Sequence, residues 1–401
     1  MNDWLASLAE PTRVRNAIYT DPRVFDAEME RIFARSWVYV GHDSEVPAPG
    51  DFKTATIGTR PVIIVRGDDA SVRVFYNRCR HRGTTVCQTE SGRTRAFRCE
   101  YHGWAYATDG RLLGVPYPSR YGAEFRTKEM GLQPVARIGI HRGFIFASLA
   151  ASGPTLDQHL GLAKRFIDEV VDVSPQGRIA LNTRRQRYGY DGSWKLQMEN
   201  AVDGYHPNFV HQSFGTAMRK LLADRMKADF SAAFSDQSPA CTWDLGNGHG
   251  VLDMRCFAPY AADERNGGGF NLAVFPNLVL IGSQVRSIWP IAANRTEVVV
   301  QPMEFVGLES LTEQRLRTHE LFYGPAGFGQ PDDAEIFQRM AVGLRADGIE
   351  WIDFSRGAGR ERREDGALIG QVTDEVPQRG FYRHWRALIG AEARAPAQPQ
   401  A

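Results

Sequence analysis

The chain has 401 residues, of which 43% are hydrophobic and 24% are charged, the composition of an ordinary globular protein with room for two domains. Its formal net charge is +1, so overall charge predicts no binding to nucleic acid or to an acidic membrane surface. The apolar runs have the length of strands and are too short to span a bilayer, and the N-terminus has no signal-peptide pattern, so we expect a cytoplasmic protein.

Three segments with different patterns follow one another along the chain. Residues 1–38 are expected to be helical and to pack on the larger domain, because Phe25, Met29 and Ile32 fall at helical spacing. Residues 39–152 contain short β-rich runs separated by turn residues, which predicts a small all-β domain.

The rest of the chain predicts a larger α+β domain over residues 153–390. Its middle, residues 228–305, is rich in strand patterns, and residues 311–325 and 331–346 have helical patterns, so we expect helices around a central antiparallel sheet. Residues 391–401 are rich in Ala, Pro and Gln, and we expect them to be disordered.

The five cysteines are too few and too scattered for a disulfide framework. Two of them belong to a metal-binding motif. Cys87, Cys241 and Cys256 are interpreted as small buried residues and not as ligands.

The first metal motif contains two pairs of ligands at the ends of predicted strands. Cys79 and His81 form a C-x-H pair, and Cys99 and His102 form a C-x-x-H pair. Two thiolates on one iron and two imidazoles on the other form a Rieske [2Fe–2S] cluster. Zinc is the alternative, since tetrahedral zinc sites also use Cys and His.

Three features of this motif favour the cluster over zinc. The ligands alternate Cys-His and Cys-His. Gly83 and Gly103 follow the two pairs and let the backbone approach the inorganic sulfides closely. Trp104 follows the last ligand and can pack over the site.

Arginines crowd the same stretch. They are either a solvated surface or a docking face for an acidic electron donor. The six residues are Arg78, Arg80, Arg82, Arg93, Arg95 and Arg98.

A second metal motif lies in the larger domain. Asp203 and His206 are three residues apart and are predicted to share a helix face, and Pro207 is expected to bend that helix so that His211 approaches His206. Two histidines and one carboxylate make the facial triad of mononuclear non-haem Fe(II). The alternative is a buried histidine pair without a metal.

The second metal motif needs a third ligand, and carboxylates that could supply it lie about 120 residues further along the chain. Asp332, Asp333 and Glu335 follow Pro331 at a predicted helix start, where acidic residues also serve simply as helix caps. The glycine-rich residues 324–329 just before them can aim one of these carboxylates at the metal.

Over nearly its whole length the sequence resembles the large (α) subunits of Rieske non-haem iron aromatic-ring-hydroxylating oxygenases. The shared features are the Rieske motif, E-N-x-x-D-G-Y-H-x-x-x-x-H, and G-P-A-G-F followed by D-D. The uninterrupted D-G-Y-H is most similar to the benzoate, anthranilate, salicylate and terephthalate group. The resemblance implies that residues 39–152 are the Rieske domain and residues 153–390 a helix-grip catalytic domain.

The resemblance also implies roles for particular residues. His206, His211 and Asp333 would hold the mononuclear iron. Asp203 would be the electron-transfer bridge, hydrogen-bonded to His206 and to a Rieske histidine, His102, of the neighbouring subunit.

The activity implied is that of a terminal oxygenase component. NAD(P)H would reduce a separate reductase, with or without a ferredoxin, and the electrons would pass through the [2Fe–2S] cluster to Fe(II), where O2 and an aromatic ring, expected to be an aromatic carboxylate, react. A homotrimer (α3) or an α3β3 assembly with a small β subunit is expected. The alternatives are a Rieske monooxygenase or O-demethylase and a pure Rieske electron carrier, and the latter has no need of the C-terminal domain.

Arg286, in a predicted strand, is a candidate clamp for a substrate carboxylate, and its alternative is an outward-facing strand residue. Arg379 lies in a segment common to the family, which favours a structural role. Further pocket candidates are the neighbours of the motifs, Asn200, Val210, Tyr323 and Phe328.

Overall fold

The computed structural model describes residues 2–181, 185–221, 230–256, 269–282, 284–318, 320–321, 324–346 and 348–390. They form two compact units, one of residues Phe33–Gly153 with Ala180 and Leu181, and one that contains the rest. The tail predicted at residues 391–401 lies outside the described residues. No described helix combines the length and the apolar character needed to cross a bilayer.

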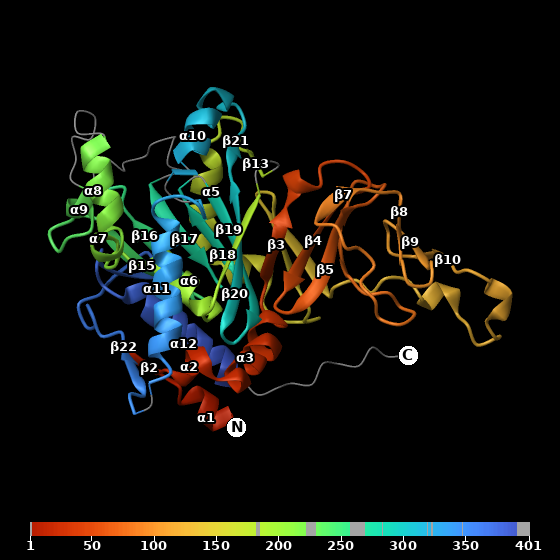
Figure 1. Cartoon of the computed structure of the whole chain (residues 1–401), viewed down its shortest axis with the longest axis horizontal. Coiled ribbons are helices and arrows are strands. Elements are labelled where there is room, and N and C mark those ends of the chain that lie inside the picture. The colour runs from red at the N-terminus through yellow and green to blue at the C-terminus, as the bar shows by residue number, and fades with distance from the viewer. Residues whose placement is uncertain are drawn as a thin grey trace. The chain divides into compact units, whose positions relative to one another are not determined.

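The smaller unit is built from antiparallel strands, as predicted (Figure 1). They make a four-stranded sheet of order β6-β5-β4-β7 and two three-stranded sheets of orders β10-β9-β8 and β11-β12-β3. The strands are β3 (Val38–His42), β4 (Asp51–Ile57), β5 (Arg60–Arg66), β6 (Val72–Tyr76), β7 (Ser91–Arg93), β8 (Ala96–Arg98), β9 (Ala105–Ala107), β10 (Leu112–Gly114), β11 (Arg137–His141) and β12 (Phe144–Ser148).

The core of this unit extends beneath the two metal-motif loops. Phe52, Ile63 and Val65 of the four-stranded sheet belong to the same buried cluster as Phe97 and Tyr106. Both motif cysteines and the tryptophan that follows them are part of that cluster. The loops therefore rest on a packed hydrophobic base.

The larger unit contains one nine-stranded antiparallel sheet of order β14-β20-β19-β18-β17-β16-β15-β24-β23. This confirms the predicted α+β class with a central antiparallel sheet. The strands are β14 (Gln186–Tyr190), β15 (Cys241–Gly246), β16 (His249–Asp253), β17 (Phe270–Val274), β18 (Leu278–Ile281), β19 (Gln284–Ala292), β20 (Arg295–Pro302), β23 (Arg362–Glu364) and β24 (Ala367–Gln371).

Helices cover both faces of this sheet. On one face, Asn271 of β17 donates a hydrogen bond to the carbonyl of Ala201 in α6 (Trp194–Ala201), and α12 (Val376–Gly390) packs on β15 and β16. On the other face, Phe166 of α5 (Ala163–Asp172) packs edge-on against Trp243 and Phe270.

The remaining helices are short, apart from α11, which contacts β14 at the sheet edge (Figure 1). Their bounds are α1 (Asn2–Ala6), α2 (Ala17–Thr20), α3 (Pro22–Glu28), α4 (Leu156–Leu160), α7 (Pro207–Val210), α8 (Gln212–Leu221), α9 (Phe230–Ala233), α10 (Thr312–Thr318) and α11 (Gln330–Gly343).

The prediction that residues 1–38 are wholly helical is wrong in part. Two short strands, β1 (Ala9–Glu10) and β2 (Arg13–Arg15), lie between α1 and α2, and β2 pairs with β22 (Trp351–Asp353). The amide of Phe354 donates to the carbonyl of Thr12 and extends this pairing. A partner so distant in sequence leaves no local signal.

Candidate metal centres and active-site cavity

The two loops of the first motif share one backbone pattern. The carbonyls of Cys79 and Cys99 accept hydrogen bonds from the amides of Gly83 and Gly103, at 3.1 and 2.9 Å. Each cysteine amide donates to the carbonyl five residues further on, at 2.8 Å in both loops. Both glycines have left-handed backbone, with φ of +83° and +71°, which other residues rarely adopt.

The four side chains predicted to hold the cluster lie on these loops. The thiols of Cys79 and Cys99 are buried. The rings of His81 and His102 are 4.5 Å apart between centroids, and His81 stacks on Trp104 at 4.9 Å. Nδ1 of His81 is buried and has no hydrogen-bond partner among the described residues, as expected for an atom that binds a metal.

Two polar residues that the sequence did not single out stabilise the first loop. The hydroxyl of Tyr106 lies 3.1 Å from Sγ of Cys79 and accepts from the amide of Arg80. Oδ1 of Asn77 accepts from the amides of Val86 and Cys87. Their only signal is proximity to the motif, because Tyr and Asn in such positions are common in any β domain.

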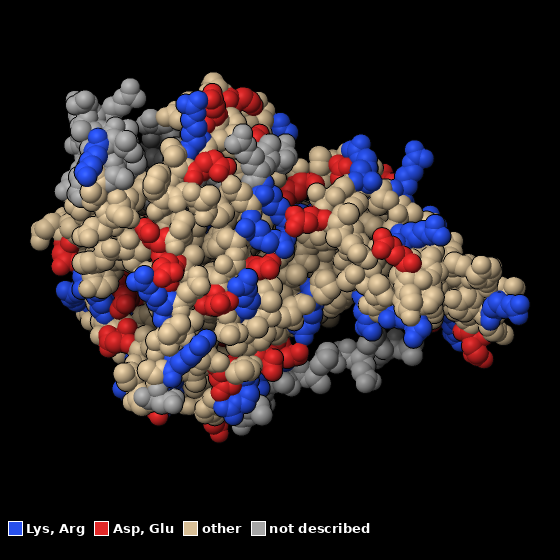
Figure 2. All heavy atoms as spheres, viewed as in Figure 1, with Lys and Arg blue, Asp and Glu red and all other residues tan. Residues whose placement is uncertain are grey.

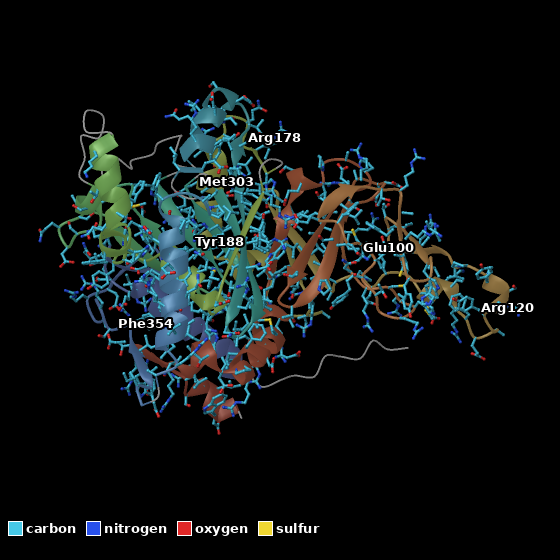
Figure 3. The ribbon with its side chains drawn as sticks, in the orientation of Figure 1. Glu100, Arg120, Arg178, Tyr188, Met303 and Phe354 are labelled. Carbon is cyan, nitrogen blue, oxygen red and sulfur yellow. The ribbon has the colours of Figure 1, made fainter. Side chains whose placement is uncertain are left out.

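The other cysteines and the six arginines of this stretch differ in their exposure to solvent. Cys87 and Cys241 are buried as expected, but Cys256 is exposed, so the expectation is wrong for that residue. The six arginines are exposed, and Arg93 is paired with Asp51. Basic side chains gather on the visible face around β8–β10, where Glu100 of the second loop is also labelled (Figures 2 and 3).

The larger unit brings His206, His211 and Asp333 together, with one ligand atom from each lying within 4.8 Å of the others. Oδ1 of Asp333 is 3.6 Å from Nε2 of His206 and 3.4 Å from Nε2 of His211. His206 immediately precedes α7, His211 ends it, and Asp333 lies in the first turn of α11.

Local structure at this site differs from the predicted continuous helix. Helix α6 ends at Ala201, and Asp203 and His206 lie in a non-helical link, so the expectation of a shared helix face is wrong. Pro207 does not bend a helix but begins α7 at its first position, where its missing N–H costs nothing.

A carboxylate lies behind each histidine. Oδ2 of Asp203 is 3.2 Å from Nδ1 of His206, close enough for an ion pair although not aligned as a hydrogen bond. Oδ2 of Asp332 is hydrogen-bonded to Nδ1 of His211 at 3.4 Å. Each imidazole therefore turns its Nε2 atom toward Asp333, the arrangement that orients metal-binding histidines.

The two histidines have different electrostatic surroundings. Burial acts to lower the pKa of His206, but its contacts with Asp203 and the charge of Asp333 together outweigh burial, so this pKa is raised above its usual value. Burial lowers the pKa of His211, and Asp333 only partly opposes that change. Nδ2 of Asn200 lies 3.2 Å from both Nε2 of His206 and Oδ1 of Asp333.

A cavity of about 70 Å³ opens beside this triad, several times the space that one water molecule needs. Its apolar wall includes Phe234, Leu252 and Ile281. Asn200 and Arg286, two of the predicted pocket residues, also line it.

The other predicted pocket residues are placed differently. Val210 and Phe328 are not among the described residues that line the cavity, and the side chain of Phe328 is 52% exposed. Tyr323 lies outside the described residues.

Arg286 is only 2% exposed, which excludes the outward-facing alternative. The strand register explains why. Ile281 pairs with both Asn271 and Gln284, so it faces the side of the sheet that α6 covers, and so does Gln284. Arg286 is two residues further along the same strand and therefore faces the same side. Its Nε donates to Oε1 of Gln284 at 2.7 Å, while its Nη1 has no hydrogen-bond partner among the residues that the structure describes.

Tyr188 of β14, labelled in Figure 3, is close enough to Arg286 and Asp333 to feel their charges. Its hydroxyl donates to Oε1 of Gln197 at 2.6 Å. Burial raises its pKa far above the usual value, while the charge of Arg286 opposes the shift and that of Asp333 adds to it. The phenol therefore stays neutral.

Arg379 has a structural environment. It donates hydrogen bonds to the carbonyls of Phe354 and Arg356 and forms an ion pair with Glu361. These contacts join α12 to the segment before β23. They engage the guanidinium within the protein, so Arg379 has a structural role.

Comparison with known families identifies both units. Residues 36–134 match the Rieske [2Fe–2S] domain, and residues 180–391 match the ring-hydroxylating alpha subunit, catalytic domain. The chain belongs to the ring-hydroxylating alpha-subunit family. This ring-hydroxylating alpha subunit therefore has both an electron-accepting domain and a catalytic domain, which excludes a pure electron carrier.

Curated relatives and solved structures agree with this assignment. The chain is 33% identical to toluate 1,2-dioxygenase subunit alpha of Pseudomonas putida, covering 89% of this chain and 85% of that protein. It is 34% identical to the anthranilate 1,2-dioxygenase large subunit of Acinetobacter baylyi, with coverages of 86% and 80%. A naphthalene 1,2-dioxygenase with bound indole superposes with a TM-score of 0.83 at 27% identity, covering 96% of this chain and 94% of that one.

As an alpha subunit of this family, the chain uses one Rieske [2Fe–2S] cluster and one mononuclear iron, and it receives electrons from NAD(P)H through a reductase. It is the oxygenase component of a multicomponent enzyme that hydroxylates aromatic rings with O2. The residues present fit both metal groups. The first motif leaves a buried imidazole nitrogen without a partner among the described residues, and the second offers two imidazoles and a carboxylate around one point.

Proposed function

We propose that this alpha subunit dihydroxylates the ring of an aromatic carboxylate. The observation that carries the proposal is Arg286, a buried guanidinium in the cavity wall beside His206, His211 and Asp333, whose Nη1 has no partner among the described residues. A buried cation without a paired anion is unfavourable, and a substrate carboxylate would provide that anion. The toluate, halobenzoate and anthranilate 1,2-dioxygenases that this chain resembles are named for such acids.

The metal ligands form part of the proposal. Cys79 and Cys99 would hold one iron of the cluster, and His81 and His102 the other. His206, His211 and Asp333 would hold the mononuclear iron, whose chemistry when bound is the reductive activation of O2.

The protein residues would position the substrate and control its surroundings. Arg286 would fix the carboxylate at the sheet wall, and Phe234, Leu252 and Ile281 would exclude water around the ring. Asp203 would fix the Nδ1 side of His206 and connect it to the Rieske domain of a neighbouring subunit.

The assembly is proposed to be a trimer, with or without a β subunit, that uses a reductase with or without a ferredoxin. Two exposed aromatic residues next to the metal site, Tyr205 and Phe209, support an intersubunit contact there. A cytoplasmic location is proposed because NAD(P)H supplies the electrons.

The test is a screen of aromatic acids with a surrogate reductase, in which NADH and O2 consumption and the products are measured together. We expect coupled consumption and a cis-dihydrodiol from a benzoate-type acid, and no coupling with the corresponding amide. A phenol or a demethylated product would instead support the monooxygenase alternative.

Arg286→Gln should raise KM for the acid by about 10- to 100-fold, since a charge-assisted hydrogen bond is lost. Arg339→Gln, an exposed arginine on α11, is the matched control and should leave KM unchanged. An unchanged KM in Arg286→Gln would exclude the clamp.

A further inference from the structure

Gln330 is a second unusual polar residue in the cavity wall. It is the first residue of α11, it lines the cavity, and it is only 2% exposed. It precedes Asp333 by three residues, so the two side chains lie on the same side of the helix with their Cα atoms about 4.5 Å apart along its axis.

The carboxamide of Gln330 makes no hydrogen bond within the described part of the chain. Both Oε1 and Nε2 are buried and without a partner. Buried carboxamides elsewhere in the unit have at least one partner: Gln197 accepts from Tyr188, and Gln378 donates to the carbonyl of Glu199. Since buried polar groups are nearly always paired, a fully unpaired amide in a cavity wall suggests that a ligand supplies its partner.

Gln330 and Arg286 reach the cavity from two different elements. Arg286 belongs to strand β19 of the sheet, and Gln330 belongs to helix α11. Nη1 of Arg286 offers two N–H donors, and the amide of Gln330 offers one acceptor and two N–H donors, all without a partner among the described residues. A ring held by its carboxylate at the sheet would thus present another substituent to the helix.

We propose that Gln330 is a specificity-determining residue that binds a hydroxyl or amino substituent on the ring of the aromatic acid. A hydroxyl or amino group can donate to Oε1 and accept from Nε2, whereas a methyl group or a halogen would leave both amide atoms buried and unpaired. This inference rests on the proposed function, because it assumes that the cavity holds an aromatic acid.

The test compares the intact oxygenase with its Gln330→Leu variant on benzoates that carry hydroxyl, amino, methyl or chloro groups at each ring position. We expect the wild-type protein to prefer a hydroxy- or aminobenzoate by about 10-fold or more in kcat/KM over the methyl and chloro isosteres. Gln330→Leu should remove or reverse that preference. Gln338→Leu, at an exposed position on the same helix, is the matched control and should retain it.

Equilibrium dialysis of the same acids under anaerobic conditions gives a second readout that does not depend on turnover. The ratio of the Kd values for hydroxy- and methylbenzoate should change about 10-fold in Gln330→Leu. If aromatic acids bind and react but this ratio is the same in both proteins, Gln330 is satisfied by water and the inference is wrong. If no aromatic acid binds, the proposed function itself fails.

Discussion

At the scale of single residues, the triad is held by a symmetrical pair of carboxylates. Asp203 lies behind His206 and Asp332 lies behind His211, so both imidazoles present Nε2 to Asp333. The two carboxylates are similarly exposed, 28% and 31%. The two carboxylates differ in their proposed roles, because only Asp203 would also contact the neighbouring subunit and conduct an electron.

Comparing Asp203→Asn with Asp332→Asn tests this difference. Both variants should retain the cluster and most of the mononuclear iron, because neither residue is a proposed ligand. Loss of an outer carboxylate costs about 10- to 100-fold in activity or metal affinity. We expect turnover in Asp203→Asn to fall by about 100-fold or more, and reoxidation of the reduced cluster to become slower. Both effects should be smaller in Asp332→Asn. Normal turnover and cluster reoxidation in Asp203→Asn would contradict the bridge role.

The sequence motifs singled out His206, His211 and Asp333, which the structure brings together, but not the residues that support them. The spacing of Cys79, His81, Cys99 and His102 indicates a cluster without any structure, because ligand chemistry is local. Asp333 needed the family resemblance, since a helix-capping aspartate has the same sequence signature. Gln330 was missed, because whether a glutamine is buried depends on tertiary packing.

At the scale of elements, the link between α6 and α7 positions the metal site. It passes so close to β24 that a Cβ atom on Gly204 would lie 2.3 Å from the carbonyl oxygen of Val372. The helical pattern of this stretch predicted a continuous helix, but Pro207 and the close approach of Gly204 interrupt it. Proline at a helix start and proline at a kink share one sequence signature, so only the fold distinguishes them.

Gly204→Ala should therefore displace Asp203 and His206 from their places. We expect a loss of about 1–3 kcal/mol of stability, as for overpacked sites. Mononuclear iron content should fall while the cluster, in the other unit, keeps its visible spectrum. Gly215→Ala on α8 is the control, because a Cβ atom there meets nothing within 4 Å. Full iron content in Gly204→Ala would show that the link tolerates the shift.

At the scale of the whole molecule, histidines that are largely shielded from water make stability depend on pH. Burial lowers the pKa of His159 and of His384 to about 4, and it lowers the pKa of His249 well below its usual value. Nδ1 of His249 accepts from the amide of Phe275, so protonation also breaks a hydrogen bond. In the opposite direction, burial raises the pKa of the carboxyls of Glu199 and Glu375 to about 7.

The histidine contribution has a definite sign. A histidine with a lowered pKa in the folded state destabilises the protein as pH falls below the unfolded value of about 6.5, by about 1.4 kcal/mol per pH unit until it titrates. His384→Phe should remove the contribution of one histidine to this loss of stability at low pH. The free energy of unfolding, measured between pH 7.5 and 5, should therefore fall less steeply in the variant. Equal slopes in the two proteins would mean that His384 is not held neutral.

The division into two units could be inferred from the sequence because each has its own pattern of hydrophobic residues, short β-rich runs in one and mixed strand and helix patterns in the other, and its own metal motif. The short strands near the N-terminus were not predictable, since the sheet that they form is completed by β22, which pairs with β2 and lies more than 300 residues away in the sequence. Among the pocket candidates that the structure describes, Asn200 and Arg286 line the cavity and Val210 and Phe328 do not, because sequence proximity to a motif does not determine side-chain direction.

The most direct test of the account is a single turnover by the oxygenase alone, because the central claim is that this chain holds both metal centres and oxygenates an aromatic acid. The protein, with its cluster reduced and its mononuclear iron present, is mixed with isotope-labelled O2 and the best acid from the screen, without reductase. We predict cluster oxidation together with a product that carries two labelled oxygen atoms, in an amount close to that of the mononuclear iron. Cluster oxidation that yields only hydrogen peroxide, or product with no dependence on the mononuclear iron, would contradict the account.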